Sequence, residues 1–113
     1  MTQDRSLLAS EQLLEANQTV GDAFRAFRQA ARTSGPLDKQ TVEFILMAGF
    51  AAAGHQSPFR NHARRALESG VAKEALQQTV MLTLGATSVL PAVANALRWI
   101  DEVEEEVNAA RKK

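Results

Sequence analysis

Hydrophobic residues recur along most of the chain with the three-to-four-residue spacing of amphipathic helices. The first hydrophobic stripe follows Ser10 and consists of Leu13, Leu14, Val20, Phe24 and Phe27. Gly21 and Asp22 interrupt this stripe and are candidates for a break into two shorter helices. The segment TSGPLD then ends the first unit, because Gly35 suits a helix terminus and Pro36 cannot continue a helix.

The segment from Leu37 to Ala53 has a different pattern. It is polar in its first turn and then hydrophobic on every side, which is typical of a helix buried all round. A chain of 113 residues can hardly enclose such a helix alone. We therefore expect either that the other helices wrap it or that a partner subunit covers one face, and the second option fits a bundle of short helices better.

The next predicted helix follows the turn GHQS. Ser57 suits its N-cap, Pro58 its first helical position, and Gly70 the position just past its end. Its hydrophobic stripe is Phe59, Ala63, Ala66 and Leu67. Three charged residues lie outside that stripe: Arg60, Arg64 and Glu68.

Two further stripes complete the pattern. The segment VAKEALQQTVMLTLG predicts a helix with Leu76, Val80, Met81 and Leu84 facing inward. After GATS, Ser88 suits the cap of a last long helix, and Pro91 is tolerated in its first turn. The inward positions of this helix are Val89, Val93, Leu97, Ile100, Val103 and Val107. No alternating stretch predicts a strand, so we expect an all-α bundle of about six helices in one domain over residues 1–113.

Composition narrows the classes of function. Thirteen basic and thirteen acidic residues cancel, so the net charge favours neither nucleic acid nor an anionic membrane as a partner. The absence of cysteine excludes disulfides, thiolate metal sites and cysteine nucleophiles. The first residues lack the pattern of a secretory signal, and the longest uncharged apolar run, from Phe44 to Gly54, is too short to span a bilayer. We therefore expect a soluble, cytoplasmic protein.

Glu43 and His62 are the first candidates for chemistry. Hydrophobic residues flank Glu43, and an unpaired carboxylate in such surroundings costs on the order of several kcal/mol. His62 lies about one turn into the following, antiparallel helix, so the two side chains meet only if the helices cross obliquely or a side chain reaches back. One interpretation is an acid/base pair in which the carboxylate orients the imidazole. The other is a satisfied buried pair, or two separately solvated groups, with no catalytic role.

Other polar residues lie near the same turn. His55 is expected at the surface or at the rim of a pocket. Arg60, Arg64 and Arg65 form a small basic cluster near a helix N-terminus, which either attracts a carboxylate substrate or forms a solvated helix face.

A metal site is the third alternative for these side chains. Glu43, His55 and His62 would supply its ligands, but their spacing matches no standard ligand signature. We therefore expect no metal and no cofactor.

One long stretch resembles a known family. The run PLDKQTVEFILMAGFAAAGHQSPFRNHARRALESGVAKEALQQTVMLTLGA, continued by LPAVANALRWIDEV, is similar to the carboxymuconolactone decarboxylase family, which includes the alkylhydroperoxidase D-like proteins. The resemblance covers roughly residues 24–103 and rests on the order of LDK, Gly54 with a histidine-ended turn, ALESGVAKEAL, and PA followed by NAL. It implies an all-α fold of interlocked helices that assembles as a dimer, trimer or hexamer.

The peroxidase branch of this family is similar in using a glutamate, a Cys-x-x-Cys pair and a histidine four residues after the second cysteine. The resemblance places the glutamate on Glu43 and the histidine on His62, while the two cysteine positions hold His55 and Pro58. Because the thiolate nucleophile is missing, we do not expect thiol peroxidase activity.

The decarboxylase branch also lacks the cysteines and carries a histidine at the place of His62. Resemblance to it implies loss of carbon dioxide from a small lactone dicarboxylic acid. Such a reaction needs a group that stabilises carboxylate charge and one that delivers a proton to carbon, for which Arg60 and His62 are candidates. That branch has a charged REHE-like segment where this chain has HQSP, and it ordinarily lacks the glutamate at Glu43, so the sequence combines features of both branches.

Two hypotheses follow. The first is a cofactor-free lyase acting on a small carboxylated lactone or a related acid. His62 would be its proton donor or base, Glu43 the orienting group or a second acid/base group, and Arg60 with His55 the substrate contacts. The alternative is a catalytically inactive family member that serves as a binding or structural oligomer, in which Glu43 and His62 only satisfy each other.

Overall fold

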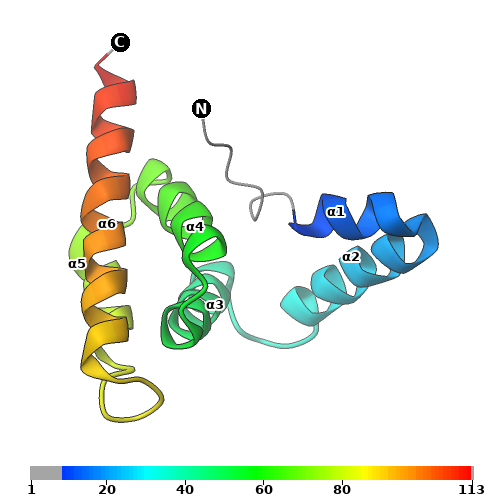
Figure 1. The fold of residues 1–113 in the computed structure, drawn as a ribbon, viewed down its shortest axis with the longest axis horizontal. Coiled ribbons are helices and arrows are strands. Elements are labelled where there is room, and N and C mark those ends of the chain that lie inside the picture. Colours follow the sequence, from blue (N-terminus) through cyan, green and yellow to red (C-terminus); the bar gives the residue numbers. More distant parts are fainter. Residues whose placement is uncertain (1–8, 113) are drawn as a thin grey trace. The chain divides into compact units, whose positions relative to one another are not determined.

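The computed structural model describes residues 9–112, and most of this part of the chain is helical. Its helices are α1 (Ala9–Ala16), α2 (Gln18–Thr33), α3 (Lys39–Ala53), α4 (Gln56–Glu68), α5 (Lys73–Met81) and α6 (Leu90–Arg111) (Figure 1). No strand occurs in the described residues, where one isolated bridge joins Leu84 and Ser88. The predicted all-α fold with about six helices is confirmed. Within the same range, no helix has the length and apolar character needed to cross a membrane.

The chain divides into two compact units, one up to Val42 and the other from Glu43 onward. In the first unit α1 packs against α2. In the second, which begins within α3, α6 packs along both α4 and α5 (Figure 1). The single domain expected from the sequence stays a prediction.

The first unit bends at Asn17, so the break predicted at Gly21 and Asp22 is wrong. Asn17 Oδ1 accepts a hydrogen bond from the backbone N–H of Val20 at 3.0 Å and so caps α2. Gly21 lies inside α2 and is buried, and a Cβ at this position would come within 2.6 Å of Leu14 Cα. Gly21 therefore allows α1 and α2 to approach closely.

The start of α3 is set by a cap at Asp38 that was not predicted from the sequence. The backbone N–H of Thr41 donates to Asp38 Oδ1 at 2.7 Å, and α3 begins at Lys39, two residues after the predicted start at Leu37. The Thr41 N–H holds the pKa of Asp38 below its ordinary value, because it stabilises the ionised carboxylate.

Part of α3 is exposed. Met47 and Ala51 are its buried residues, whereas Ile45 is 55% exposed. The choice between wrapping by the other helices of the chain and cover by a partner subunit stays a prediction.

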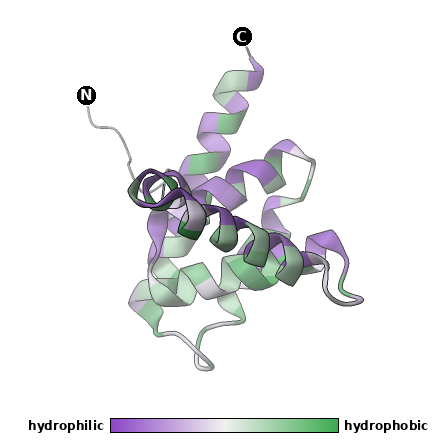
Figure 2. Ribbon diagram, turned by 90° about the vertical axis from the view of Figure 1, so that its right-hand side faces the viewer, coloured by the Kyte–Doolittle hydropathy of each residue, from purple (hydrophilic) through white to green (hydrophobic). Residues whose placement is uncertain are grey.

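The core of the second unit is built from hydrophobic faces of its four helices. Its largest fully buried side chains are Phe59, Met47, Leu76, Ile100, Val80 and Val103. The Phe59 and Trp99 rings pack with centroids 5.7 Å apart and link α4 to α6. Hydrophobic and hydrophilic residues alternate along α6 in Figure 2, as expected for a helix with one buried face.

The ends of α4 differ in how well they were predicted. The helix begins at Gln56 with His55 before it, so Ser57 is not the N-cap and lies buried in the first turn. Pro58 also falls in that turn, where a missing N–H costs no helical hydrogen bond. Gly70 has a φ of +97° just past the helix, so its predicted role at the C-terminus is confirmed.

The inward stripe predicted for α5 is only half correct. Leu76 and Val80 are fully buried, whereas Met81 and Leu84 are exposed. The cause is that α5 ends at Met81 and the chain then turns, with Gly85 at a φ of +81°. The last helix likewise begins after Val89, so Ser88 is not its N-cap.

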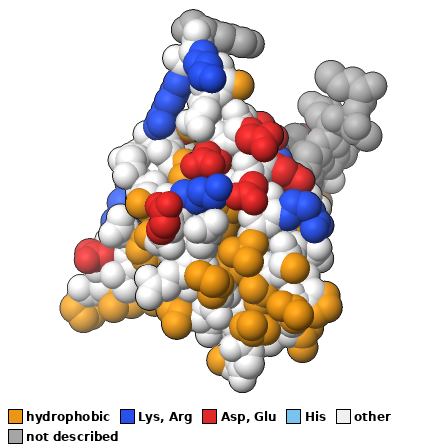
Figure 3. All heavy atoms as spheres, turned by 90° about the vertical axis from the view of Figure 1, so that its left-hand side faces the viewer, with side chains coloured by type: hydrophobic (Ala, Val, Ile, Leu, Met, Phe, Trp, Pro, Cys, Tyr) orange, Lys and Arg blue, Asp and Glu red, His pale blue; other side chains and the backbone are white. Residues whose placement is uncertain are grey.

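This turn carries a cluster of exposed hydrophobic side chains, called here the α5–α6 patch. Its members are Met81, Leu82, Leu84, Val89 and Leu90. Figure 3 views the side of the molecule that carries α5 and α6 and shows hydrophobic side chains gathered below a band of charged ones. Apolar surface of this kind on a small protein is typical of an interaction site.

Candidate functional site

Glu43 on α3 and His62 on α4 meet across the two helices. The chain turns at Gly54, whose φ is +76°, and leads from α3 into α4. Glu43 Oε1 then lies 2.6 Å from His62 Nδ1. The structure therefore forms the contact that residue spacing alone did not decide.

The two side chains of the Glu43–His62 pair differ in their exposure to solvent. The His62 side chain is 7% exposed and that of Glu43 is 23% exposed. An ionised carboxylate can only accept hydrogen bonds, so Nδ1–H of His62 donates to an ionised Glu43. This arrangement fixes the tautomer of the imidazole and leaves Nε2 as its basic nitrogen.

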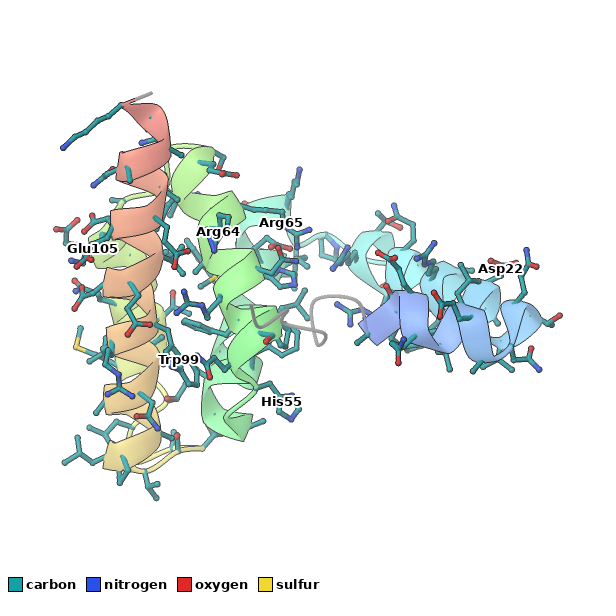
Figure 4. The ribbon with its side chains drawn as sticks, turned by 45° about the horizontal axis from the view of Figure 1, so that its top comes forward. Asp22, His55, Arg64, Arg65, Trp99 and Glu105 are labelled. Carbon is teal, nitrogen blue, oxygen red and sulfur yellow. The ribbon has the colours of Figure 1, made fainter. Side chains whose placement is uncertain are left out.

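Phe50, one helical turn before the end of α3, packs against the imidazole. Its ring centroid lies 5.3 Å from that of His62 and 6.4 Å from that of His55. His55 is exposed at the N-terminal end of α4, as labelled in Figure 4. His55 thus lies at the surface beside Phe50, in agreement with the expectation, and its substrate contact stays a prediction.

Arg60 points toward α6. Its Nη1 lies 2.7 Å from Glu102 Oε1 and its Nη2 lies 2.8 Å from Glu106 Oε2. Residues two apart on a helix do not share a face, so Arg60 and His62 leave α4 in different directions. The geometry gives Arg60 a role in joining α4 to α6, and its substrate contact stays a prediction.

Arg65 is the arginine that the structure brings to the Glu43–His62 pair. Its Nη2 lies 3.0 Å from His62 Nδ1, 3.4 Å from His62 Nε2 and 4.0 Å from Glu43 Oε1. Figure 4 shows Arg64 and Arg65 leaving α4 on different sides, and Arg64 binds Glu106 of α6. The sequence predicted Arg60, Arg64 and Arg65 as one basic cluster. The three-residue spacing from His62 to Arg65, which places both on one face, was the signal that separates them.

The site is an acid/base pair with a cation beside it. Among residues 9–112, no group of three or more histidine, aspartate or glutamate side chains gathers closely enough to hold a metal ion. Of the three residues weighed as metal ligands, Glu43 and His62 touch each other, while His55 lies at the start of α4 beside Phe50.

Comparison with known proteins adds one finding. The family model described as the carboxymuconolactone decarboxylase family matches residues 18–102, a range that includes Glu43, His62 and Arg65. No curated protein and no solved structure matches the chain.

Proposed function

Because the chain belongs to the carboxymuconolactone decarboxylase family, we propose that it is a cofactor-free lyase acting on a small carboxylated lactone or a related acid. The observation that carries the proposal is the 2.6 Å contact between His62 Nδ1 and Glu43 Oε1. A carboxylate bound to one imidazole nitrogen prepares the other for proton transfer, as in general acid/base catalysis.

In the proposed reaction His62 handles the proton. Loss of carbon dioxide breaks a carbon–carbon bond and leaves its electron pair on the lactone, where the pair is delocalised as an enolate. His62, protonated on both nitrogens, delivers the Nε2 proton to the carbon at the end of the shifted double bond. Glu43 stabilises the imidazolium before this transfer and holds the ring in position afterwards.

The rim of the site would supply substrate contacts. We place His55 among them, because it is exposed beside Phe50, whose ring packs on His62. A contact from Arg60 would require the substrate carboxylate to replace Glu102 or Glu106, which both lie within 2.8 Å of its guanidinium.

The test is release of carbon dioxide from a panel of lactone acids and β-keto acids. We expect His62→Gln to lower kcat by about 10²-fold or more, since positioned acid/base groups contribute that much. Arg98→Gln, at an exposed position on α6, is the control and should retain the wild-type rate. Unchanged turnover in His62→Gln removes His62 from the mechanism. If the wild-type protein turns over no member of the panel, the catalytically inactive alternative replaces the lyase.

We also propose that the chain forms a homo-oligomer, as a dimer, trimer or hexamer. Two surfaces support this: the exposed face of α3 at Ile45 and the α5–α6 patch. The segment from Ala75 to Leu97 contains no charged residue, so nothing within it opposes burial against a second copy. A cytoplasmic location stays an expectation from the sequence.

A further inference from the structure

The Glu43–His62 pair has a charged neighbour to which no role has been assigned. We propose that Arg65 anchors a carboxylate group of the substrate beside His62 and so makes the site prefer anionic over neutral substrates. This inference rests on the proposed function only in taking the Glu43–His62 pair as the place where substrate binds.

The three arginines of α4 differ in how fully their charge is matched. Arg60 and Arg64 lie 2.6–2.8 Å from carboxylate oxygens of α6, whereas the ion pair of Arg65 with Glu43 measures 4.0 Å. Glu43 Oε1 is also shared with His62, which is much closer to it at 2.6 Å. Arg65 therefore carries the least compensated positive charge on this helix.

Arg65 is also the most exposed of these three arginines. The Arg65 side chain is 53% exposed, compared with 18% for Arg60 and 36% for Arg64. A guanidinium presents five N–H donors in a planar fork that fits the two oxygens of a carboxylate. An anion arriving from solvent can therefore bind Arg65 without first displacing a protein carboxylate from a short ion pair.

Arg65 lies over a face of the His62 imidazole rather than at its edge. Its Nη2 is 3.0 Å from Nδ1 and 3.4 Å from Nε2 of His62. An atom in the plane of the ring and this close to both nitrogens would clash with the ring carbons, so Nη2 lies over the face of the imidazole. The in-plane direction of Nε2 is not taken by Arg65, and a carboxylate held by the guanidinium lies next to that nitrogen.

Binding of glutarate, compared with its neutral dimethyl ester, tests the anchor. Titration followed by the imidazole C–H signals of His62 in NMR reports binding at this site, and His55→Gln assigns the two histidines. We expect the wild-type protein to bind glutarate more tightly than the ester. Arg65→Gln should weaken glutarate binding by about 10-fold to 100-fold, the range for a hydrogen-bonded charge pair, and leave ester binding unchanged.

Two further variants separate anchoring from support of the fold. Arg65→Lys keeps the charge but loses the planar fork, so its glutarate affinity should fall between those of wild type and Arg65→Gln. Arg64→Gln, the neighbouring arginine bound to Glu106, should bind glutarate as the wild type does. A purely structural role for Arg65 would alter glutarate and ester binding together.

The anchor is overturned if glutarate leaves the His62 signals of the wild type unmoved, or if Arg65→Gln binds it equally well. Should Arg65→Gln fail to fold, wild-type affinity in Arg65→Lys overturns it instead. Failure of the proposed lyase is a separate result: glutarate binding would depend on Arg65, while carbon dioxide release would be absent or independent of His62.

Discussion

Glu43 Oε1 on α3 lies 2.6 Å from His62 Nδ1 on α4, although 19 positions separate the two residues in the sequence. The contact is shielded, since only 7% of the His62 side chain is exposed. A buried hydrogen bond adds little net stability by itself, but its loss leaves a buried polar group without a partner, which is costly. Without Glu43, a buried imidazole N–H would lose its acceptor.

Replacement of Glu43 should therefore destabilise the fold. Glu43→Ala is expected to lower the free energy of unfolding by about 1–3 kcal/mol, and Glu43→Gln by less, because the amide oxygen still accepts a hydrogen bond. Urea denaturation at pH 7 measures both. Glu105→Ala, at an exposed position on α6, is the control and should stay within about 0.5 kcal/mol of wild type. Equal losses in Glu43→Ala and Glu105→Ala would contradict the prediction.

The sequence predicted the helices well because helical spacing of hydrophobic residues survives in the fold. Val93, Ile100, Val103 and Val107 of α6 are buried as expected. Helix ends were predicted less well, since they depend on single hydrogen bonds. Asn17 is of a residue type that favours the N-cap of a helix. The break was nevertheless predicted at Gly21, because glycine is a weak helix former.

For the site, the sequence identified the residue types but not their partners. Glu43 and His62 were chosen correctly as a pair that can meet, yet the contact depends on how α3 and α4 cross, which no spacing within one helix determines. Arg60 was named as the substrate contact, and that contact stays a prediction. The directions in which the arginines leave α4 bring Arg65, rather than Arg60, to the Glu43–His62 pair.

The two arginines that approach Glu102 offer a matched comparison. Arg60 lies 2.7 Å from Glu102 and is 18% exposed, whereas Arg98 lies 4.0 Å away and is 59% exposed. Arg60→Ala should cost about 1–2 kcal/mol of unfolding free energy, and Arg98→Ala no more than about 0.5 kcal/mol. Thermal and urea unfolding of both variants measure this. A loss in Arg98→Ala as large as that in Arg60→Ala would show that the α4–α6 ion pair of Arg60 is no stronger than the exposed pair of Arg98 within α6.

Lys73 predicts how stability changes at alkaline pH. Hydrogen bonds from Nζ to Asp101 and Glu104, at 2.7 and 3.1 Å, raise the pKa of Lys73 above its ordinary value of 10.5. The folded chain therefore holds this proton more tightly than the unfolded chain. The stabilisation is complete below pH 10.5 and is lost as the pH rises through the raised pKa.

Lys73→Met should reduce the fall in stability at alkaline pH, because this variant has no proton to lose at position 73. The sequence contains no tyrosine and no cysteine, so few other side chains titrate in this range. Unfolding midpoints between about pH 9 and 12 measure the effect, with Lys112→Met at the end of α6 as the control. A variant curve parallel to that of the wild type would refute the link between Lys73 and alkaline stability.

Two glycines inside helices predict effects of opposite sign. At Gly21 a Cβ would meet Leu14 Cα at 2.6 Å, so Gly21→Ala should force α1 and α2 apart and cost about 1–3 kcal/mol. At Gly49 no described atom lies within 4 Å of the added Cβ, apart from the chain neighbours and the backbone of the same helix. Gly49→Ala should therefore stabilise the chain by about 0.5–1 kcal/mol through helix propensity. Circular dichroism during thermal unfolding compares them. A stabilised Gly21→Ala variant would contradict the close approach.

The α5–α6 patch predicts how the chain assembles. Leu82 and Leu90 are 70% and 64% exposed, so a charge at either position is tolerated in a single chain but is costly when a second copy covers it. Leu82→Glu and Leu90→Glu should therefore shift the molar mass measured by light scattering toward the monomer, with helix content unchanged. Asn108→Glu adds the same charge at an exposed position of α6, outside both the patch and the uncharged segment from Ala75 to Leu97, and should leave the mass unaltered. A wild-type chain that is monomeric at every concentration contradicts the oligomer itself. A wild-type oligomer that both glutamate variants preserve moves the interface away from this patch, and the exposed face of α3 at Ile45 becomes the surface to which the same charge test applies.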